Sequence, residues 1–164
     1  MQEPLPNGWV SLDAFPMLQM VAGTGSSEPS ESVSYSVLAG SDLSAMMDLA
    51  AVAKPGPFGL RTPELGTYIG RREHGRLIAM TGERLRVPDY VESSAICTHP
   101  DARGRGFGVL LTQGLMALAR QRGQIAFLHV RADNNAAVSL YRRLGFRVRR
   151  EIWVLWRKPS GKPA

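Results

Sequence analysis

The sequence predicts a mixed α/β fold in which helices cover both faces of one central sheet. Apolar residues recur at helical spacing in several stretches, while other stretches alternate or run apolar as strands do. The expected order is one strand, two helices, three strands, a helix, a strand, a helix and a final strand. A length of 164 residues suits a single domain with a proper core.

The N-terminal stretch is expected to lie outside the main domain. Residues 1–31 are predicted to form an arm and a linker rich in glycine, serine and proline. Within the arm, the apolar run from Pro16 to Ala22 predicts a short extra strand or a segment that packs on the body. The domain itself is expected over residues 32–158, and residues 159–164 form a polar tail.

Each element of the domain has a local signal. Strands are indicated by alternating or continuous apolar residues, helices by an apolar face, and boundaries by Asn, Gly and Pro. The predicted elements are a strand over 32–38, a helix over 42–53, a short helix from Thr62, a hairpin over 67–72 and 76–87, a central strand over 90–98, a helix from Val109 to Gly123, a strand over 124–131, a helix over 136–144, and strands over 146–148 and 152–157.

Composition narrows the classes of partner and compartment. Hydrophobic residues make up 44% and charged residues 21%, as in ordinary globular proteins. The net charge of +6 favours an anionic partner such as a phosphorylated cofactor. The basic residues are scattered rather than interleaved with aromatics, so we expect no nucleic acid partner. The single cysteine suits a reducing compartment, and no apolar run reaches membrane-spanning length, so we expect a cytoplasmic protein without a membrane partner.

A glycine-rich turn follows the central strand. Residues 103–108 read Arg-Gly-Arg-Gly-Phe-Gly and lead directly into a helix. The first amides of a helix have no partner within the helix, and glycines let a phosphate approach the backbone closely. Arg103 and Arg105 add full positive charges. The sequence therefore predicts a pyrophosphate-binding turn.

Two motifs together resemble the GNAT superfamily of acyl-CoA-dependent N-acyltransferases. Residues 103–108 match its Arg/Gln-x-x-Gly-x-Gly/Ala signature, and residues 134–146 match its N-x-x-A-x-x-L-Y-x-x-x-G-F element. The motifs stand in the family's order with a predicted strand between them, and the resemblance covers roughly residues 32–158. It implies a mixed, mostly antiparallel sheet with a splay between the fourth and fifth core strands.

The resemblance also implies acetyl-CoA as cosubstrate and no metal. The pantetheine arm would bind backbone groups of Ile96, Cys97 and Thr98. The pyrophosphate would lie on the turn and the helix start, formed by Arg103, Gly104, Arg105, Gly106, Phe107, Gly108 and Val109. Asn134 would contact the cofactor through its side chain, act as a plain N-cap, or do both.

Three side chains are candidates for proton transfer. Tyr141 stands at the family's tyrosine position, where a phenol with a pKa of about 10 can protonate a leaving thiolate. Glu92 and His129 compete for the role of base, each at a position where some GNAT members carry a glutamate. The alternatives stay open: a solvated strand-edge carboxylate for Glu92, a hydrogen-bonded histidine inside the sheet for His129, and a core position for Tyr141. Cys97 lies in an apolar run, which argues against a covalent route.

These features predict an enzyme that moves the acetyl group of acetyl-CoA to a primary amine by direct attack in a ternary complex. A CoA-binding sensor without turnover is the alternative. The acceptor is left open among small amines, amino acids and peptides, although Arg61 could hold an acceptor carboxylate. A homodimer is also left open.

Overall fold

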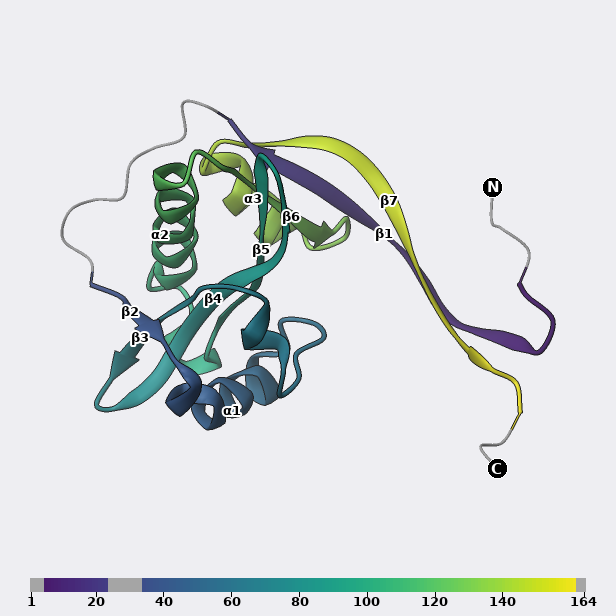
Figure 1. The fold of residues 1–164 in the computed structure, drawn as a ribbon, viewed down its shortest axis with the longest axis horizontal. Helices are drawn as coiled ribbons and strands as arrows, with labels where there is room; N and C mark the ends of the chain where they lie inside the picture. The colour runs from purple at the N-terminus through teal and green to yellow at the C-terminus, as the bar shows by residue number, and fades with distance from the viewer. Residues whose placement is uncertain (1–4, 24–33, 162–164) are drawn as a thin grey trace.

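The sheet has seven strands in the order β2-β3-β4-β5-β6-β1-β7 (Figure 1). The computed structural model describes residues 5–23 and 34–161. Every neighbouring pair is antiparallel except β5 and β6, which confirms the mixed, mostly antiparallel sheet. The elements are β1 (Trp9–Ala22), β2 (Ser36–Leu38), η1 (Gly40–Asp42), α1 (Leu43–Ala53), η2 (Thr62–Leu65), β3 (Tyr68–Glu73), β4 (Arg76–Val87), β5 (Tyr90–Thr98), η3 (Pro100–Ala102), α2 (Phe107–Gln121), β6 (Ile125–Arg131), α3 (Asn135–Arg143) and β7 (Phe146–Pro159).

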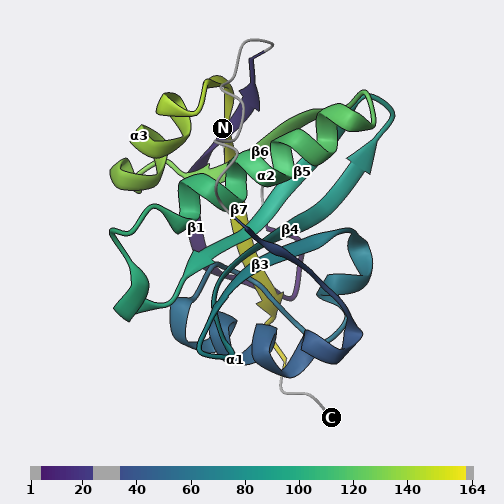
Figure 2. The same cartoon turned by 90° about the vertical axis from the view of Figure 1, so that its left-hand side faces the viewer.

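Helices cover both faces of the sheet, as predicted (Figure 2). Against one face, α1 buries Met46 and Leu49 among side chains that include Tyr68 and Cys97. Against the other face, α2 and α3 pack over two clusters whose buried members include Met20, Ile69, Leu111, Met116, Leu128 and Phe146. None of the described helices combines the length and the apolar character that a bilayer crossing requires.

The N-terminal stretch forms a longer strand than predicted. Instead of a short extra strand, β1 runs for 14 residues and lies between β6 and β7. Its inner half pairs with both neighbours and buries Met20 completely. The sheet therefore includes residues from the stretch that was predicted to lie outside the domain. The predicted start of the domain at residue 32 stays a prediction. The linker is predicted over residues 23–31; its residues 24–31 and the first two residues of the predicted strand over 32–38 lie outside the described residues.

A single strand, β7, replaces the two strands predicted after Gly145. The polar run from Arg147 to Glu151 suggested a break, but pairing with β1 continues through it. The register shifts there, because Gln19 pairs with Arg150 while Met20 pairs with Val148. Arg149 is therefore the extra residue of a β-bulge.

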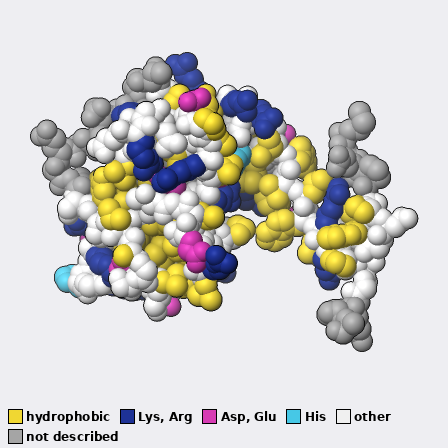
Figure 3. All heavy atoms as spheres, viewed as in Figure 1, with side chains coloured by type: hydrophobic (Ala, Val, Ile, Leu, Met, Phe, Trp, Pro, Cys, Tyr) yellow, Lys and Arg dark blue, Asp and Glu magenta, His cyan; other side chains and the backbone are white. Residues whose placement is uncertain are grey.

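The outer halves of β1 and β7 leave the body as a two-stranded ribbon (Figure 1). Pairing continues to its end, where Trp9 lies opposite Pro159. Hydrophobic side chains lie on the face of the ribbon that Figure 3 shows, and Trp153 and Trp156 are 57% and 52% exposed. Phe15 packs its ring edge-on against Trp156, with centroids 6.3 Å apart. Cross-strand contacts of this kind contribute to holding such a ribbon together.

The strands β5 and β6 part soon after they meet. Their parallel pairing runs only from Tyr90 to Glu92, although β5 continues to Thr98. Ala95 then adopts a left-handed backbone with φ of 51°, where the register between β4 and β5 shifts. A bulge at this point turns β5 away from β6. The predicted splay between the fourth and fifth core strands is thus confirmed.

Candidate active site

A row of hydrogen-bonded side chains crosses five neighbouring strands. Glu92 on β5 and His129 on β6, predicted as competing bases, are partners: Oε1 of Glu92 lies 2.8 Å from Nδ1 of His129. Arg84 on β4 holds the same carboxylate from the other side through two nitrogens, one of them 3.0 Å from Oε2. Gln19 on β1 places its Nε2 3.0 Å from Nε2 of His129, and Arg149 on β7 donates to Oε1 of Gln19 over 2.7 Å.

This row assigns the proton on His129. A guanidinium only donates, so Oε1 of Gln19 accepts from Arg149 and Nε2 of Gln19 must be its donor. That donor requires a lone pair on Nε2 of His129, and the carboxylate of Glu92 requires a proton on Nδ1. The neutral imidazole therefore donates to Glu92 and turns its lone pair toward β1. A lone pair in that position is what a general base needs.

Glu92 is buried and stays ionised. Its side chain is 3% exposed, against 15% for His129, so the predicted alternative of a solvated strand-edge carboxylate is wrong. Burial alone would raise the pKa of Glu92, but hydrogen bonds from His129 and Arg84 outweigh it and lower that pKa below its usual value. A carboxylate held this way is a weak base toward an amine. It is well suited to orient His129 and to stabilise the imidazolium that forms when His129 takes a proton.

The glycine-rich turn has the backbone shape of an anion site. Gly104 and Gly106 have φ of 75° and 83°, and a side chain built at either position would meet nothing within 4 Å. Glycine is therefore required there by backbone conformation and leaves the turn open. Helix α2 begins directly after it, and Leu110 donates the first helical bond, to the carbonyl of Gly106. The amides of Phe107, Gly108 and Val109 precede that bond, and a phosphate fits such groups.

The two arginines of the turn are placed differently. Arg105 forms an ion pair with Glu73 at 2.5 Å and lies 4.8 Å over the ring of Phe107. Its hydrogen bonds are the main reason that the pKa of Glu73 is lowered. The amide of Arg103 donates to the carbonyl of Pro100 over 3.2 Å and closes the short η3 helix. That either side chain contacts a phosphate stays a prediction.

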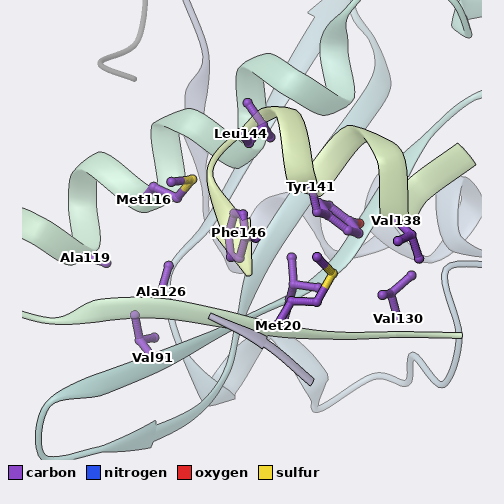
Figure 4. Close-up of a cluster of buried hydrophobic side chains, with 11 residues drawn as sticks. Met20, Val91, Met116, Ala119, Ala126, Val130, Val138, Tyr141, Leu144 and Phe146 are labelled. Atoms are coloured by element: carbon purple, nitrogen blue, oxygen red, sulfur yellow. The ribbon is translucent and has the colours of Figure 1, made fainter. Parts of the chain in front are cut away.

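The second motif supplies a buried tyrosine and a helix cap. Tyr141 on α3 points into the core beside Phe146, with ring centroids 5.9 Å apart (Figure 4). Burial raises the pKa of Tyr141 to about 12, so the phenol is protonated at neutral pH. Asn134 accepts from the amide of Ala137 over 3.1 Å, which confirms the predicted N-cap. The cofactor contact of Asn134 and the acid role of Tyr141 remain predictions.

Beyond Glu92, the segment predicted to bind pantetheine lies where β5 has left β6. Ile96 packs toward the α2 and α3 side, whereas Cys97 packs toward α1. The outer edge of β5 in this segment is where a ligand's polar groups can pair with the backbone. Among residues 5–23 and 34–161, no three His, Cys, Asp or Glu side chains gather as metal ligands would.

The thiol of Cys97 is predicted to be inert. Burial raises its pKa to about 12, and the residue is 8% exposed. The thiolate is the reactive form, so raising the pH from 7 to 9 still leaves almost all of the thiol protonated. We expect iodoacetamide to alkylate the native protein at pH 8 at least about 100-fold more slowly than glutathione. Mass spectrometry of the intact protein over time measures this rate, and the urea-unfolded protein is the control. Labelling as fast as glutathione would contradict a buried thiol.

Sequence reasoning missed Gln19, Arg84 and Arg149. Gln19 lies before the region of the family resemblance, and Arg149 sits in a polar run that suggested a break between strands. Arg84 could have been found from sequence. Side chains alternate between the two faces of a strand, and Arg84 lies on a strand that was predicted to neighbour the central strand over 90–98. Arg61, proposed from sequence to hold an acceptor carboxylate, is instead exposed and paired with Glu64 at 2.8 Å.

A hollow adjoins the row at Gln19 and Arg149, which are both among its lining residues. It measures about 240 Å³ and is lined by Gln19, Val21, Val87, Tyr90, Phe127 and Arg149. The ring of Phe127 meets that of His129 edge-on, with centroids 5.7 Å apart. The hollow thus combines an apolar wall with Gln19 and Arg149, which are connected to the imidazole of His129 by hydrogen bonds.

Comparisons with known proteins place these features in context. The model of the FR47-like protein family matches residues 68–154. The N-alpha-acetyltransferase RimI of Mycobacterium tuberculosis is 42% identical over 82 residues, which are 48% of this chain and 51% of that protein. The mycothiol acetyltransferase of a Mycobacterium species is 40% identical over 79 residues, 45% of this chain and 26% of that protein. The chain thus spans about half of the first relative and about a quarter of the second.

Two solved structures extend the likeness to the whole fold. One, from Novosphingobium aromaticivorans and described as a GNAT-family acetyltransferase, is 35% identical with a TM-score of 0.90, covering 97% of this chain and 72% of that one. The ribosomal-protein-S18-alanine N-acetyltransferase of Escherichia coli has a TM-score of 0.63 at 24% identity, covering 80% of this chain and 96% of that one. The second likeness concerns the fold alone.

Proposed function

The chain belongs to the GNAT family, in which it matches the FR47-like proteins, and on that premise we propose that it transfers the acetyl group of acetyl-CoA to a primary amine. The observation that carries this proposal is the Glu92–His129 pair at 2.8 Å. It lies where β5 and β6 part, on the strand that leads into the glycine-rich turn. The RimI and mycothiol acetyltransferase relatives, named for acetyl transfer, support the same activity.

The chain offers a binding group for each part of acetyl-CoA. The amides at the start of α2 and the open turn at Gly104 and Gly106 would take the pyrophosphate. The free edge of β5 from Ile96 to Thr98 would pair with the amides of the pantetheine arm. Bound this way, the cosubstrate supplies an activated acyl group beside the base, and the protein supplies its position.

His129 and Tyr141 would divide the proton transfers. As the amine nitrogen attacks the acyl carbon, a C–N bond forms and Nε2 of His129 takes the proton that the nitrogen loses. Glu92 stabilises the resulting imidazolium through Nδ1. When the C–S bond breaks, the departing thiolate takes the proton of the Tyr141 hydroxyl. Exchange with water then returns a proton to Tyr141 and removes one from His129.

Replacing Tyr141 with phenylalanine is expected to lower kcat by about 10- to 100-fold. The phenol is protonated up to a pKa of about 12, so the wild type can donate across the neutral range. Phenylalanine keeps the ring packing against Phe146 and removes only the donor. Steady-state kinetics of both forms measure the effect, with thermal melting as the control for folding. A phenylalanine form with the full wild-type kcat would remove Tyr141 from the acid role.

The proposed function is tested by binding and turnover together. Calorimetry with acetyl-CoA tests the cosubstrate site, and free-thiol release over a panel of primary amines tests transfer. We expect binding, together with thiol release that depends on an amine. Binding without release over the whole panel would favour the alternative, a CoA-binding sensor. No binding at all would overturn both.

A further inference from the structure

Among the described residues, the side chain of Arg149 forms no ion pair with a carboxylate. Several other arginines near the sheet are paired with carboxylates, such as Arg72 with Asp42 and Arg105 with Glu73, whereas Arg71 and Arg76 contact Ser34 and His99. In the described part of the chain, Arg149 contacts only the uncharged Oε1 of Gln19. It is also exposed and lines the hollow beside His129. A guanidinium placed there offers further N–H donors to an anion in the hollow.

Gln19 occupies the place where an acceptor amine has to arrive. Its Nε2 lies 3.0 Å from Nε2 of His129. This nitrogen donates to the lone pair that the proposed reaction uses. Its Oε1 lies 2.7 Å from the guanidinium of Arg149. One carboxamide therefore bridges the base and the arginine, with a nitrogen toward the first and an oxygen toward the second.

An α-amino acid also presents a nitrogen and an oxygen close together, the first on its amine and the second on its carboxylate. Its amine would replace Nε2 of Gln19 at His129, and its carboxylate would replace Oε1 at Arg149 with a charge-assisted, bidentate contact. The side chain would then lie against the apolar wall formed by Val21, Val87 and Phe127. A volume of about 240 Å³ accommodates a small molecule of this size.

We propose that the hollow is the acceptor site and that its acceptor is a primary amine with a carboxylate on the neighbouring carbon, held by Arg149 after Gln19 turns aside. This proposal rests on the proposed acetyl transfer and narrows its substrate class. Gln19 covers the lone pair of His129, and the carboxylate of the correct substrate competes for Arg149 and releases Gln19. An amine without a carboxylate gains no such contact.

The test compares matched acceptors with and without the charge. Thiol release from acetyl-CoA is measured with L-alanine and L-alaninamide, glycine and glycinamide, and L-phenylalanine and its amide. All are assayed at the same pH. The pKa of each acceptor amine is measured beforehand by titration, so that its free-base concentration at the assay pH is known. For the wild type we expect kcat/KM for the acids to exceed that for the amides by about 10- to 100-fold per free amine. In Arg149→Gln, the KM of the acids should rise more than that of the amides, until the preference for the acids is lost.

A matched control separates the contact from the loss of charge. Lys158→Gln removes one positive charge from an exposed position on the same strand, and it should keep the preference for acids. Three results would each overturn the inference. The wild type could favour the amides, it could transfer only to amines that lack a carboxylate, or Arg149→Gln could keep an unchanged preference. Acetyl-CoA binding with none of the acids used would do the same. Failure to bind acetyl-CoA would instead reject the proposed function itself.

Discussion

Replacing His129 with glutamine is expected to lower kcat by about 100- to 10,000-fold, the range typical of a lost general base. Glutamine can still donate a hydrogen bond toward Glu92, so the buried carboxylate keeps a partner. What it lacks is a nitrogen that accepts a proton at neutral pH. The affinity for acetyl-CoA should not change, because the groups proposed to bind it lie on β5 and α2.

The measurement is steady-state kinetics with an accepted amine over pH 5.5 to 9, with calorimetry for acetyl-CoA. The kcat of the variant should lie below that of the wild type across this whole range. His74→Asn is the matched control, because His74 is an exposed histidine in the β3–β4 turn with φ of 48°, a conformation that asparagine tolerates. A glutamine form with the wild-type kcat would show that the amine arrives deprotonated or that another group takes its proton.

Local sequence signals predicted the parts of the site that are local in the chain. The turn at residues 103–108 and the cap at Asn134 each depend on backbone conformation within a few residues, and glycine or asparagine identity reports on that conformation directly. The motifs also drew attention to Glu92 and His129, but as rival candidates for one role, whereas the structure shows them hydrogen-bonded to each other. Whether two side chains on different strands touch depends on register, which no single strand encodes.

The remaining parts of the site depend on contacts distant in sequence. Gln19 and His129 are 110 residues apart in the chain, and Gln19 and Arg149 are 130 apart. The run from Pro16 to Ala22 is apolar enough to predict a strand, but nothing in it indicates insertion between β6 and β7. The bulge at Arg149 arises only from pairing with β1. For that reason the polar run appeared from sequence as a gap between two strands.

Glu83 is the residue next to Arg84 on β4, and its side chain lies on the opposite face of the sheet from the hydrogen-bonded row that contains Glu92 and His129. Its side chain is fully buried, and its two oxygens accept from Arg86, from Arg122 and, over 3.0 Å, from the amide of Thr67. These contacts tie β4 to the end of α2 and to the start of β3. Glu83→Ala leaves the amide of Thr67 without its acceptor, removes the partner of two arginines and opens a cavity.

We expect Glu83→Ala to lower the free energy of unfolding by about 3 kcal/mol. Breaking a buried ion pair costs about 3–5 kcal/mol, and the lower end applies because the two arginines are 45% and 34% exposed and regain water. For a chain of this size the melting temperature should fall by about 6–12 °C. Urea titration and thermal melting followed by circular dichroism measure both quantities. Glu64→Ala, which breaks the exposed pair with Arg61, should cost less than about 1 kcal/mol.

The pH dependence of this difference identifies its cause. Burial acts to raise the pKa of Glu83, but the hydrogen bonds from Arg86, Thr67 and Arg122 prevail and hold that pKa below the reference value of 4.5. A carboxyl whose pKa is lower in the folded state adds stability that is complete above the unfolded-state pKa and is lost as the pH falls through the folded-state pKa. The gap between wild type and Glu83→Ala should therefore be constant from pH 6 to 8 and should shrink below about pH 4.5. A gap that stays unchanged down to pH 3 would mean that packing around the side chain, and not its charge, supplies the stabilisation.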